Sequence, residues 1–175
     1  SHANGLGTGP INLSAGGVTA NTASNVVRAI EFNTPVGAVI PNDIVLPTGT
    51  VTNLSLQGRD NTSVFTLAGV ISGGNAGLTN WVDFGNAASV GVMRLSNPAN
   101  NFVAPRIHVN RGVLAITADG CLGNGANSLM LNNGSAAAGG LRFDAAGITV
   151  SHNITVQSAT SVNLFGDNNG DGVQD

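Results

Sequence analysis

The stretch GVLAITADGCLGNGANSLMLNNG, residues 112–134, decides the fold that we expect for this chain. It contains two short apolar runs, Val113–Ile116 and Leu129–Leu131, and the residues between and after them are rich in Gly, Asn and Asp. Gly and Asn adopt left-handed backbone conformations at little cost, so clusters of them are typical of tight corners. Each apolar run therefore predicts a short β-strand, and each polar cluster predicts the corner that joins it to the next strand.

The same plan recurs near the start of the chain. The sequence HANGLGTGPINL, residues 2–13, matches ADGCLGNGANSLML, residues 118–131, with a Leu-Gly-x-Gly step before an apolar triplet in both. Further along, NDIVL (residues 42–46) matches HNITV (residues 152–156). Because the offsets of these matches are similar, they indicate an internal repeat of roughly 110 residues.

The repeat favours a solenoid over a β-sandwich or a barrel. Two sandwich domains would need a linker, whereas the rungs of a solenoid bury one another's inward faces without one. At about 20 to 25 residues per rung, the chain predicts roughly seven rungs. We expect one β-helix segment over residues 1–175, with a partial repeat in 1–94 and a second copy in 95–175, as an excerpt of a longer array. Ile44 and Ile154, which align in the repeat, should both point into one continuous core.

The region Leu95–Phe143 resembles the autotransporter-associated β-strand repeat. The resemblance rests on six short elements, which are Leu95-Ser96, Asn101-Phe102, Ile107-His108-Val109, Gly112-Val113-Leu114, Leu122-Gly123 and Asn132-Asn133-Gly134. It implies an all-β, right-handed parallel β-helix of a secreted or surface-displayed bacterial protein, and therefore an extracellular or cell-surface location. The Lys that commonly precedes the Leu-Ser opening in that family is replaced here by Arg94, and no translocating barrel domain is present, so the secretion route stays open.

Composition excludes two classes of partner. The formal net charge is −3, all six basic residues are Arg, and they form no cluster, so we expect no nucleic-acid binding. No apolar run approaches the 18 or so residues of a membrane-spanning helix, so we expect no membrane span in this segment. The single cysteine, Cys121, cannot form an internal disulfide and aligns with Gly5 in the repeat. We therefore expect it to be a small residue near a turn.

The sequence DNNGDGVQD, residues 167–175, resembles the start of a calcium-binding loop. Oxygen ligands at alternate positions can converge on one ion when a Gly at the sixth position permits the sharp turn. The acid that usually stands at the twelfth position is missing, which predicts weak binding. The alternative is a solvated polar turn. The candidate calcium ligands are Asp167, Asn169, Asp171, Val173 through its carbonyl, and Asp175.

The remaining ionisable residues predict no catalytic site. His108, His152, Asp43 and Asp144 do not combine at spacings that suggest general acid–base chemistry, and Glu31 is the only glutamate. We expect a non-catalytic structural or adhesive segment, such as a stalk, an adhesin body or a matrix fibre. The alternative is a non-catalytic or glycan-binding part of a polysaccharide-degrading β-helix protein. The expected partners are the same chain, stacked end to end or as further repeats, and host or matrix glycans and proteins.

Overall fold

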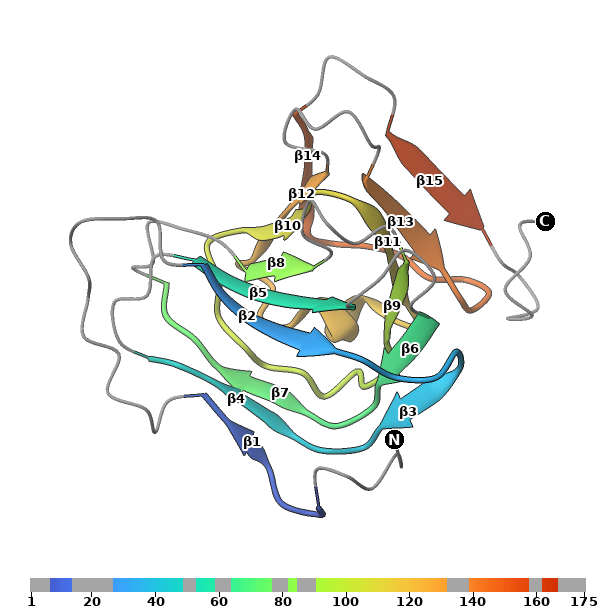
Figure 1. The fold of residues 1–175 in the computed structure, drawn as a ribbon. Helices are drawn as coiled ribbons and strands as arrows, with labels where there is room; N and C mark the ends of the chain where they lie inside the picture. The colour runs from blue at the N-terminus through green and yellow to red at the C-terminus, as the bar shows by residue number, and fades with distance from the viewer. Residues whose placement is uncertain are drawn as a thin grey trace.

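The chain forms a parallel β-solenoid in which three sheets wrap around one core (Figure 1). The computed structural model describes residues 7–13, 27–48, 53–58, 64–76, 82–84, 91–131, 139–157 and 162–166. Two sheets hold six strands each and the third holds three, and every strand pairing among them is parallel. This confirms the all-β solenoid. Within the described ranges no helix is long and apolar enough to cross a membrane.

The strands fall into three sheets, which we call A, B and C. Sheet A contains β1 (Ile11–Asn12), β4 (Ile44–Leu46) and β7 (Ile71–Gly73). Sheet B contains β2 (Val27–Phe32), β5 (Asn53–Gly58), β8 (Val82–Phe84), β10 (Ile107–Val109), β12 (Ser128–Leu131) and β14 (Asn153–Val156). Sheet C contains β3 (Ala38–Ile40), β6 (Val64–Leu67), β9 (Val92–Leu95), β11 (Gly112–Ile116), β13 (Gly139–Phe143) and β15 (Asn163–Gly166). Each turn of the solenoid therefore places one strand in sheet B and the next in sheet C, and the first turns add a strand in sheet A.

The strands stack in register, so alternation along one strand becomes a column across the sheet. In sheet B, for example, Leu129 pairs with Ile107 on one side and with Ile154 on the other. Because successive side chains of a strand point to opposite faces, one set of columns faces inward and forms the core. The fully buried core side chains include Leu56, Leu95, Ile107, Ile116, Leu129, Leu131 and Leu141.

The corners are built from glycine and asparagine, as the sequence predicts. Gly74 has φ +84°, and a Cβ there would lie 2.1 Å from the Val103 carbonyl oxygen, so only glycine fits. Asn100 is buried, accepts a hydrogen bond from the Ile71 amide at 2.8 Å, and donates one to the Cys121 carbonyl at 2.9 Å. It therefore links three successive turns. The hydrogen bonds described for this side chain go to the backbone of neighbouring rungs.

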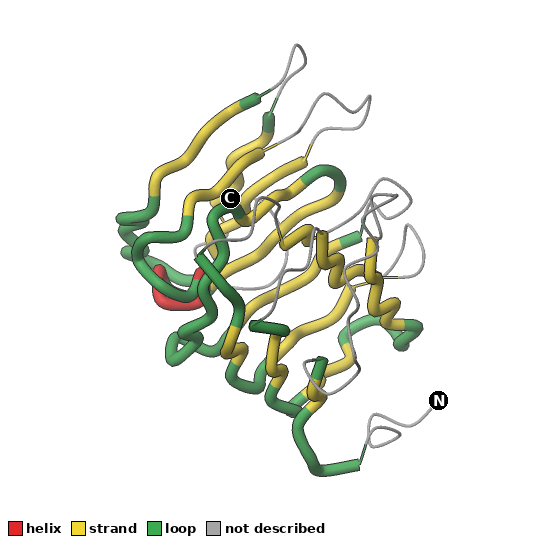
Figure 2. The backbone as a smooth tube through the Cα atoms, turned by 90° about the vertical axis from the view of Figure 1, so that its left-hand side faces the viewer, coloured by secondary structure: helices red, strands yellow, loops and turns green. Residues whose placement is uncertain are grey.

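A further corner residue, Asn127, shows the same use of the amide. Its Oδ1 accepts from the Ala104 amide at 2.9 Å, and its Nδ2 donates to the carbonyls of Phe102 and Leu122 at 3.0 and 2.9 Å. Between these corners, η1 (Asp119–Leu122) is a single 3-10 turn at the edge of the stack (Figure 2). Asparagine is favoured at such corners because its amide pairs with backbone groups that would otherwise be buried without partners.

Two sequence-based expectations need correction. The segments aligned by the repeat lie in different walls, since Ile44 belongs to sheet A and Ile154 to sheet B. Every wall carries the same inward–outward alternation, so an alignment cannot tell one wall from another. Ile44 is buried in the core, as predicted, but Ile154 is 41% exposed because β14 is the outermost described strand of its sheet.

Some elements also differ from those that the sequence predicts. The two long sheets hold six described strands each, fewer than the roughly seven rungs that the spacing predicts. The apolar run Ile148–Val150 also predicts a strand, but residues 148–150 lie in a corner outside regular structure. The sequence predicts no strand at β3, β7 or β8. Each of these strands is stabilised by parallel pairing with a neighbouring strand.

Candidate functional site

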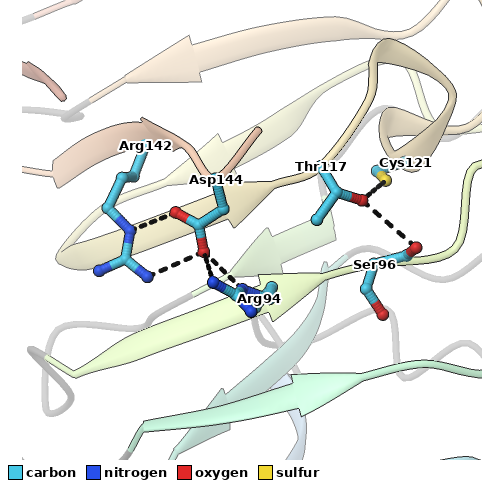
Figure 3. Close-up of polar contacts among 6 residues, drawn as sticks. All are labelled: Arg94, Ser96, Thr117, Cys121, Arg142 and Asp144. Carbon is cyan, nitrogen blue, oxygen red and sulfur yellow. Dashed lines mark hydrogen bonds and ion pairs between the residues drawn. The ribbon is translucent and has the colours of Figure 1, made fainter. Parts of the chain in front are cut away.

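A buried carboxylate, that of Asp144, lies between two arginines on the outer face of sheet C (Figure 3). Its Oδ1 accepts from Arg142 Nε at 2.5 Å, and its Oδ2 accepts from Arg142 Nη2 at 2.9 Å and from Arg94 Nε at 2.5 Å. The Asp144 side chain is 0% exposed, whereas those of Arg94 and Arg142 are 30% and 14% exposed. With guanidinium donors on both of its oxygens, this carboxylate serves as an ionic brace and is poorly placed to accept a proton from a substrate.

The small side chain of Ala115 makes this arrangement possible. Ala115 is fully buried and pairs with Arg94 on one side and with Arg142 on the other. Adjacent strands lie about 4.8 Å apart, so the two arginines are about 10 Å apart along the column. A larger residue at position 115 would fill the space that the Asp144 carboxylate occupies. The cluster therefore joins β9, β11 and β13, three successive strands of sheet C.

The only cysteine lies close to this brace but is closed to solvent. Thr117 Oγ1 donates to the Ser96 carbonyl at 3.3 Å and lies 3.5 Å from Cys121 Sγ (Figure 3). Cys121 is fully buried within η1. A thiol in this position fills a corner, and a substrate in solution has no access to it.

A second cluster fixes the corner that precedes β14. Asp119, in η1, accepts from the Ser151 amide at 3.1 Å, from Ser151 Oγ at 2.5 Å and from His152 Nδ1 at 2.7 Å. Burial raises the pKa of the Asp119 carboxyl, but these hydrogen bonds and the charge of His152 outweigh burial and hold the pKa below its ordinary value.

The imidazole of His152 is held between two acceptors. Its Nδ1 faces the Asp119 carboxylate, and its Nε2 lies 3.1 Å from the carbonyl oxygen of Asn124. Neither a carboxylate nor a carbonyl can donate, so both hydrogen bonds form only when both ring nitrogens carry a proton. The side chain is buried, at 2% exposure. Asp119 and His152 thus form a hydrogen-bonded link between two corners.

A third pair lies on the outer face of sheet B. His108 Nδ1 forms a hydrogen bond with Asp83 Oδ1, and both residues are buried. Ser55 stands in the same column but on the far side of Asp83 from His108, and its hydroxyl donates to Gln57 Oε1 at 3.3 Å. A nucleophilic serine has to face the histidine, so the order of the column does not match a Ser-His-Asp arrangement.

The described end of the solenoid formed by β14 and β15 exposes core-type side chains. Ile154 and Val156 continue the inward columns of Leu129 and Leu131, and Leu164 continues that of Leu141. The three earlier residues are 0% exposed, whereas Ile154, Val156 and Leu164 are 41%, 59% and 59% exposed. β14 and β15 are the outermost strands of their sheets (Figure 1), so their outer edges also lack a described partner strand. This end therefore combines exposed apolar side chains with two strand edges.

The predicted calcium ligands lie outside the described residues. Asp167, Asn169, Asp171, Val173 and Asp175 all fall in the range 167–175, and calcium binding there stays a prediction. Within the described ranges, no three His, Cys, Asp or Glu side chains are grouped so that they could hold a metal ion.

Comparison with known proteins gives no relative for this chain. No protein-family model matches it, no curated protein matches it, and no solved structure matches it. The resemblance to the autotransporter-associated repeat therefore rests on the quoted residues alone.

Sequence reasoning missed both ionic clusters. Arg94 and Asp144 are separated by 50 residues, and Asp119 and His152 by 33. Such pairs become neighbours only through the number of residues in each rung, which varies along the chain. A correct rung-by-rung register would have identified the brace, because Arg94, Ala115 and Arg142 then share one column.

Proposed function

We propose that this chain is a non-catalytic structural or adhesive segment of a secreted or cell-surface bacterial β-solenoid, such as part of a stalk, an adhesin body or a matrix fibre. The observation that carries the proposal is the use of its ionisable side chains. Asp144, with Arg94 and Arg142, braces successive strands of sheet C, and the pair Asp119–His152 ties one corner to the next. Arg94 and Asp144 are linked across the intervening strand β11, and Asp119 and His152 are linked between successive turns, which is the role of structural residues.

The mechanism that we propose is passive resistance to deformation. Each strand of a parallel solenoid pairs with the rungs on both sides, so force or thermal motion must break a row of backbone hydrogen bonds to detach one rung. The ionic braces add side-chain links between the same rungs. The resemblance of Leu95–Phe143 to the autotransporter-associated repeat supports the extracellular setting in which such a segment would act.

Single-molecule force spectroscopy tests this proposal directly. The chain is placed between two reference domains and pulled from its ends. We expect stepwise unfolding in which one rung of about 25 residues releases about 90 Å, from a maximum of about 3.6 Å per residue. The variant Asp144→Asn should lower the force of the steps. Asp43→Asn is the matched control, because Asp43 is exposed and accepts a hydrogen bond from the Val70 amide.

A parallel measurement addresses polysaccharide degradation and glycan binding. The same protein is incubated with a panel of polysaccharides, and released reducing ends and bound glycan are measured. We expect neither. Two results would contradict a structural role and support the glycan-binding alternative. One is the release of reducing ends. The other is saturable glycan binding by a chain that unfolds at low force without steps.

A further inference from the structure

We propose that Asn124-Gly125, in the corner between η1 and β12, is a site of spontaneous covalent modification, at which the Asn124 side chain deamidates to aspartate and isoaspartate. The proposal goes beyond the structural role above and does not depend on it. Asparagine is a thermolabile residue, and the only co-reactant that the reaction needs is water. Among the described residues, this is the single Asn-Gly pair.

The reaction is an attack of one residue on the side chain of the residue before it. The backbone nitrogen of Gly125 gives up its proton to solvent and forms a bond to Cγ of Asn124. The bond between Cγ and Nδ2 then breaks, and the amide leaves as ammonia after taking up a proton. Water opens the resulting succinimide ring at either of its carbonyls, so the product is aspartate or isoaspartate. No step changes an oxidation state.

The attacking nitrogen is accessible in the folded chain. Asn124 and Gly125 are both exposed, and a Cβ at position 125 would meet nothing within 4 Å. Within the part of the chain that the structure describes, the Gly125 amide donates no hydrogen bond. A paired amide would have to break its hydrogen bond before it could react, whereas this amide has none to break. Glycine also lacks the Cβ that hinders ring closure at other residues.

The Asn124 side chain is polarised for this attack. Its Oδ1 accepts a hydrogen bond from the Ala126 amide at 2.9 Å, which is the arrangement of an Asx turn. A backbone N–H at this oxygen stabilises the negative charge that develops there when Cγ is attacked. Nδ2, which is the leaving group, has no partner among the described residues. The turn therefore supplies an oxyanion donor and leaves both the attacking and the departing nitrogen free.

Another corner contains the same turn with proline in place of glycine. Residues 97–100 read Asn-Pro-Ala-Asn, and residues 124–127 read Asn-Gly-Ala-Asn. Asn97 Oδ1 accepts from the Ala99 amide at 3.0 Å, and each turn is closed by a hydrogen bond from its fourth amide to its first carbonyl, at 3.3 and 2.8 Å. Proline has no N–H, so Asn97 cannot form the ring. The molecule thus contains a reactive turn and an unreactive one of the same form.

Modification would change the contacts of this corner with its neighbours. The Asn124 carbonyl oxygen accepts from the Asn127 amide at 2.8 Å and lies 3.1 Å from His152 Nε2. In isoaspartate the main chain runs through Cγ and is one carbon longer, and the former carbonyl is a free carboxylate. The turn that Asn127 closes cannot keep its present geometry. Because Asn127 Oδ1 accepts from the Ala104 amide, we expect both amides to lose protection from hydrogen exchange.

Ageing of the folded protein tests the site. The chain is incubated at mildly alkaline pH, which favours the deprotonated amide, and is then cleaved after arginine. Asn97 and Asn124 fall in the separate peptides 95–106 and 112–142, and electron-transfer fragmentation distinguishes isoaspartate from aspartate. Fragmentation also separates Asn124 from Asn133, which lies in the same peptide. We expect Asn124 to deamidate at least tenfold faster than Asn97.

Two reciprocal substitutions control for the turn. Gly125→Pro should abolish deamidation of Asn124 and preserve the corner, because Gly125 does not have a positive φ and the turn of residues 97–100 already contains a proline there. Pro98→Gly should make Asn97 reactive. That reaction should be slower than the one at Asn124, because Asn97 Nδ2 donates to the Ala68 carbonyl at 3.0 Å. Circular dichroism checks that both variants are folded.

Three results would overturn the proposal. One is an intact Asn124 in the folded protein after a period in which the urea-unfolded chain deamidates there. Another is deamidation of Asn124 that continues in Gly125→Pro. The third is unchanged hydrogen exchange at Asn127 in protein that carries isoaspartate at position 124. Loss of Asn127 protection on ageing of the wild type, with none in aged Gly125→Pro, would support it.

Discussion

Replacing Asp144 by Asn tests whether the ionic brace on sheet C holds the solenoid together. The substitution keeps the volume of the side chain but removes its charge and puts an amide donor beside guanidinium donors. Arg94 and Arg142 would then share a neutral side chain with one acceptor oxygen in place of a carboxylate with two. Because the new amide would still lie over Ala115, the change isolates electrostatics from packing.

The expected magnitude follows from the exposure of the three side chains. Removing one partner of a fully buried ion pair costs about 3 to 5 kcal/mol, and an exposed pair contributes about 0 to 1 kcal/mol. Here the acceptor is 0% exposed, while the donors are 30% and 14% exposed and can be partly rehydrated. We therefore expect Asp144→Asn to lower the free energy of unfolding by about 2 kcal/mol.

Urea unfolding followed by circular dichroism measures this change. With a slope of about 2 kcal/mol per molar urea, the midpoint should fall by about 1 M. Asp43→Asn removes the same charge from an exposed site and should shift the midpoint much less. In an Arg94→Gln background the effect of Asp144→Asn should shrink, since part of the interaction is already lost. The reasoning would be refuted if Asp144→Asn and Asp43→Asn shifted the urea midpoint equally. It would also be refuted if the effects of Asp144→Asn and Arg94→Gln on the free energy of unfolding were fully additive.

Three further predictions concern a titrating carboxyl, the core and a corner. Because the pKa of Asp119 is lowered in the folded state, its ionised carboxylate stabilises the fold at pH values above the ordinary carboxyl pKa. This stabilisation is lost as the pH falls through the pKa of Asp119 in the folded protein. Urea midpoints measured at several pH values should therefore show that the stability difference between wild type and Asp119→Asn vanishes in acid. Leu131→Ala, at a fully buried position, should cost about 3 kcal/mol in the same unfolding assay, and Leu131→Asp should unfold the neighbouring rungs, seen as lost amide protection in hydrogen exchange. Gly74→Ala should lower the melting temperature more than Gly37→Ala. Both glycines have positive φ, but only position 74 has a carbonyl oxygen 2.1 Å from the new Cβ. Equal decreases in melting temperature would mean that backbone strain alone causes the loss of stability.

The fold could be predicted from the sequence because a solenoid rung is a local unit. The alternation around Leu129 and Leu131 predicts a strand with two inward side chains, and both are fully buried. The clusters of Gly and Asn predict the corners, as Gly74 and Asn100 confirm. Short strands such as β8 escaped prediction because their stability comes from the strands on either side, not from their own three residues.

The candidate sites could not be predicted, because they depend on which rungs lie next to each other. Asp119 and His152 are ordinary residues in separate corners until the stack brings them to 2.7 Å. The internal repeat aligned segments that lie in different sheets, because an apolar residue such as Ile44 has equivalents in every sheet. For the same reason the sequence does not show which apolar side chains are exposed: Val156 has the sequence of a core residue, and only its place on the outermost described strand of the sheet exposes it.

This ambiguity between walls suggests why a chain with only 9% charged residues places several of its charges between rungs. Apolar columns alone specify the register of a stack weakly, because a slipped rung would still meet Leu, Ile or Val on both sides. The brace is specific to one register: if β13 slipped along β11, Asp144 would keep Arg142, which lies two residues away, but would lose the charged hydrogen bond from Arg94 on β9. The brace therefore penalises a slipped register.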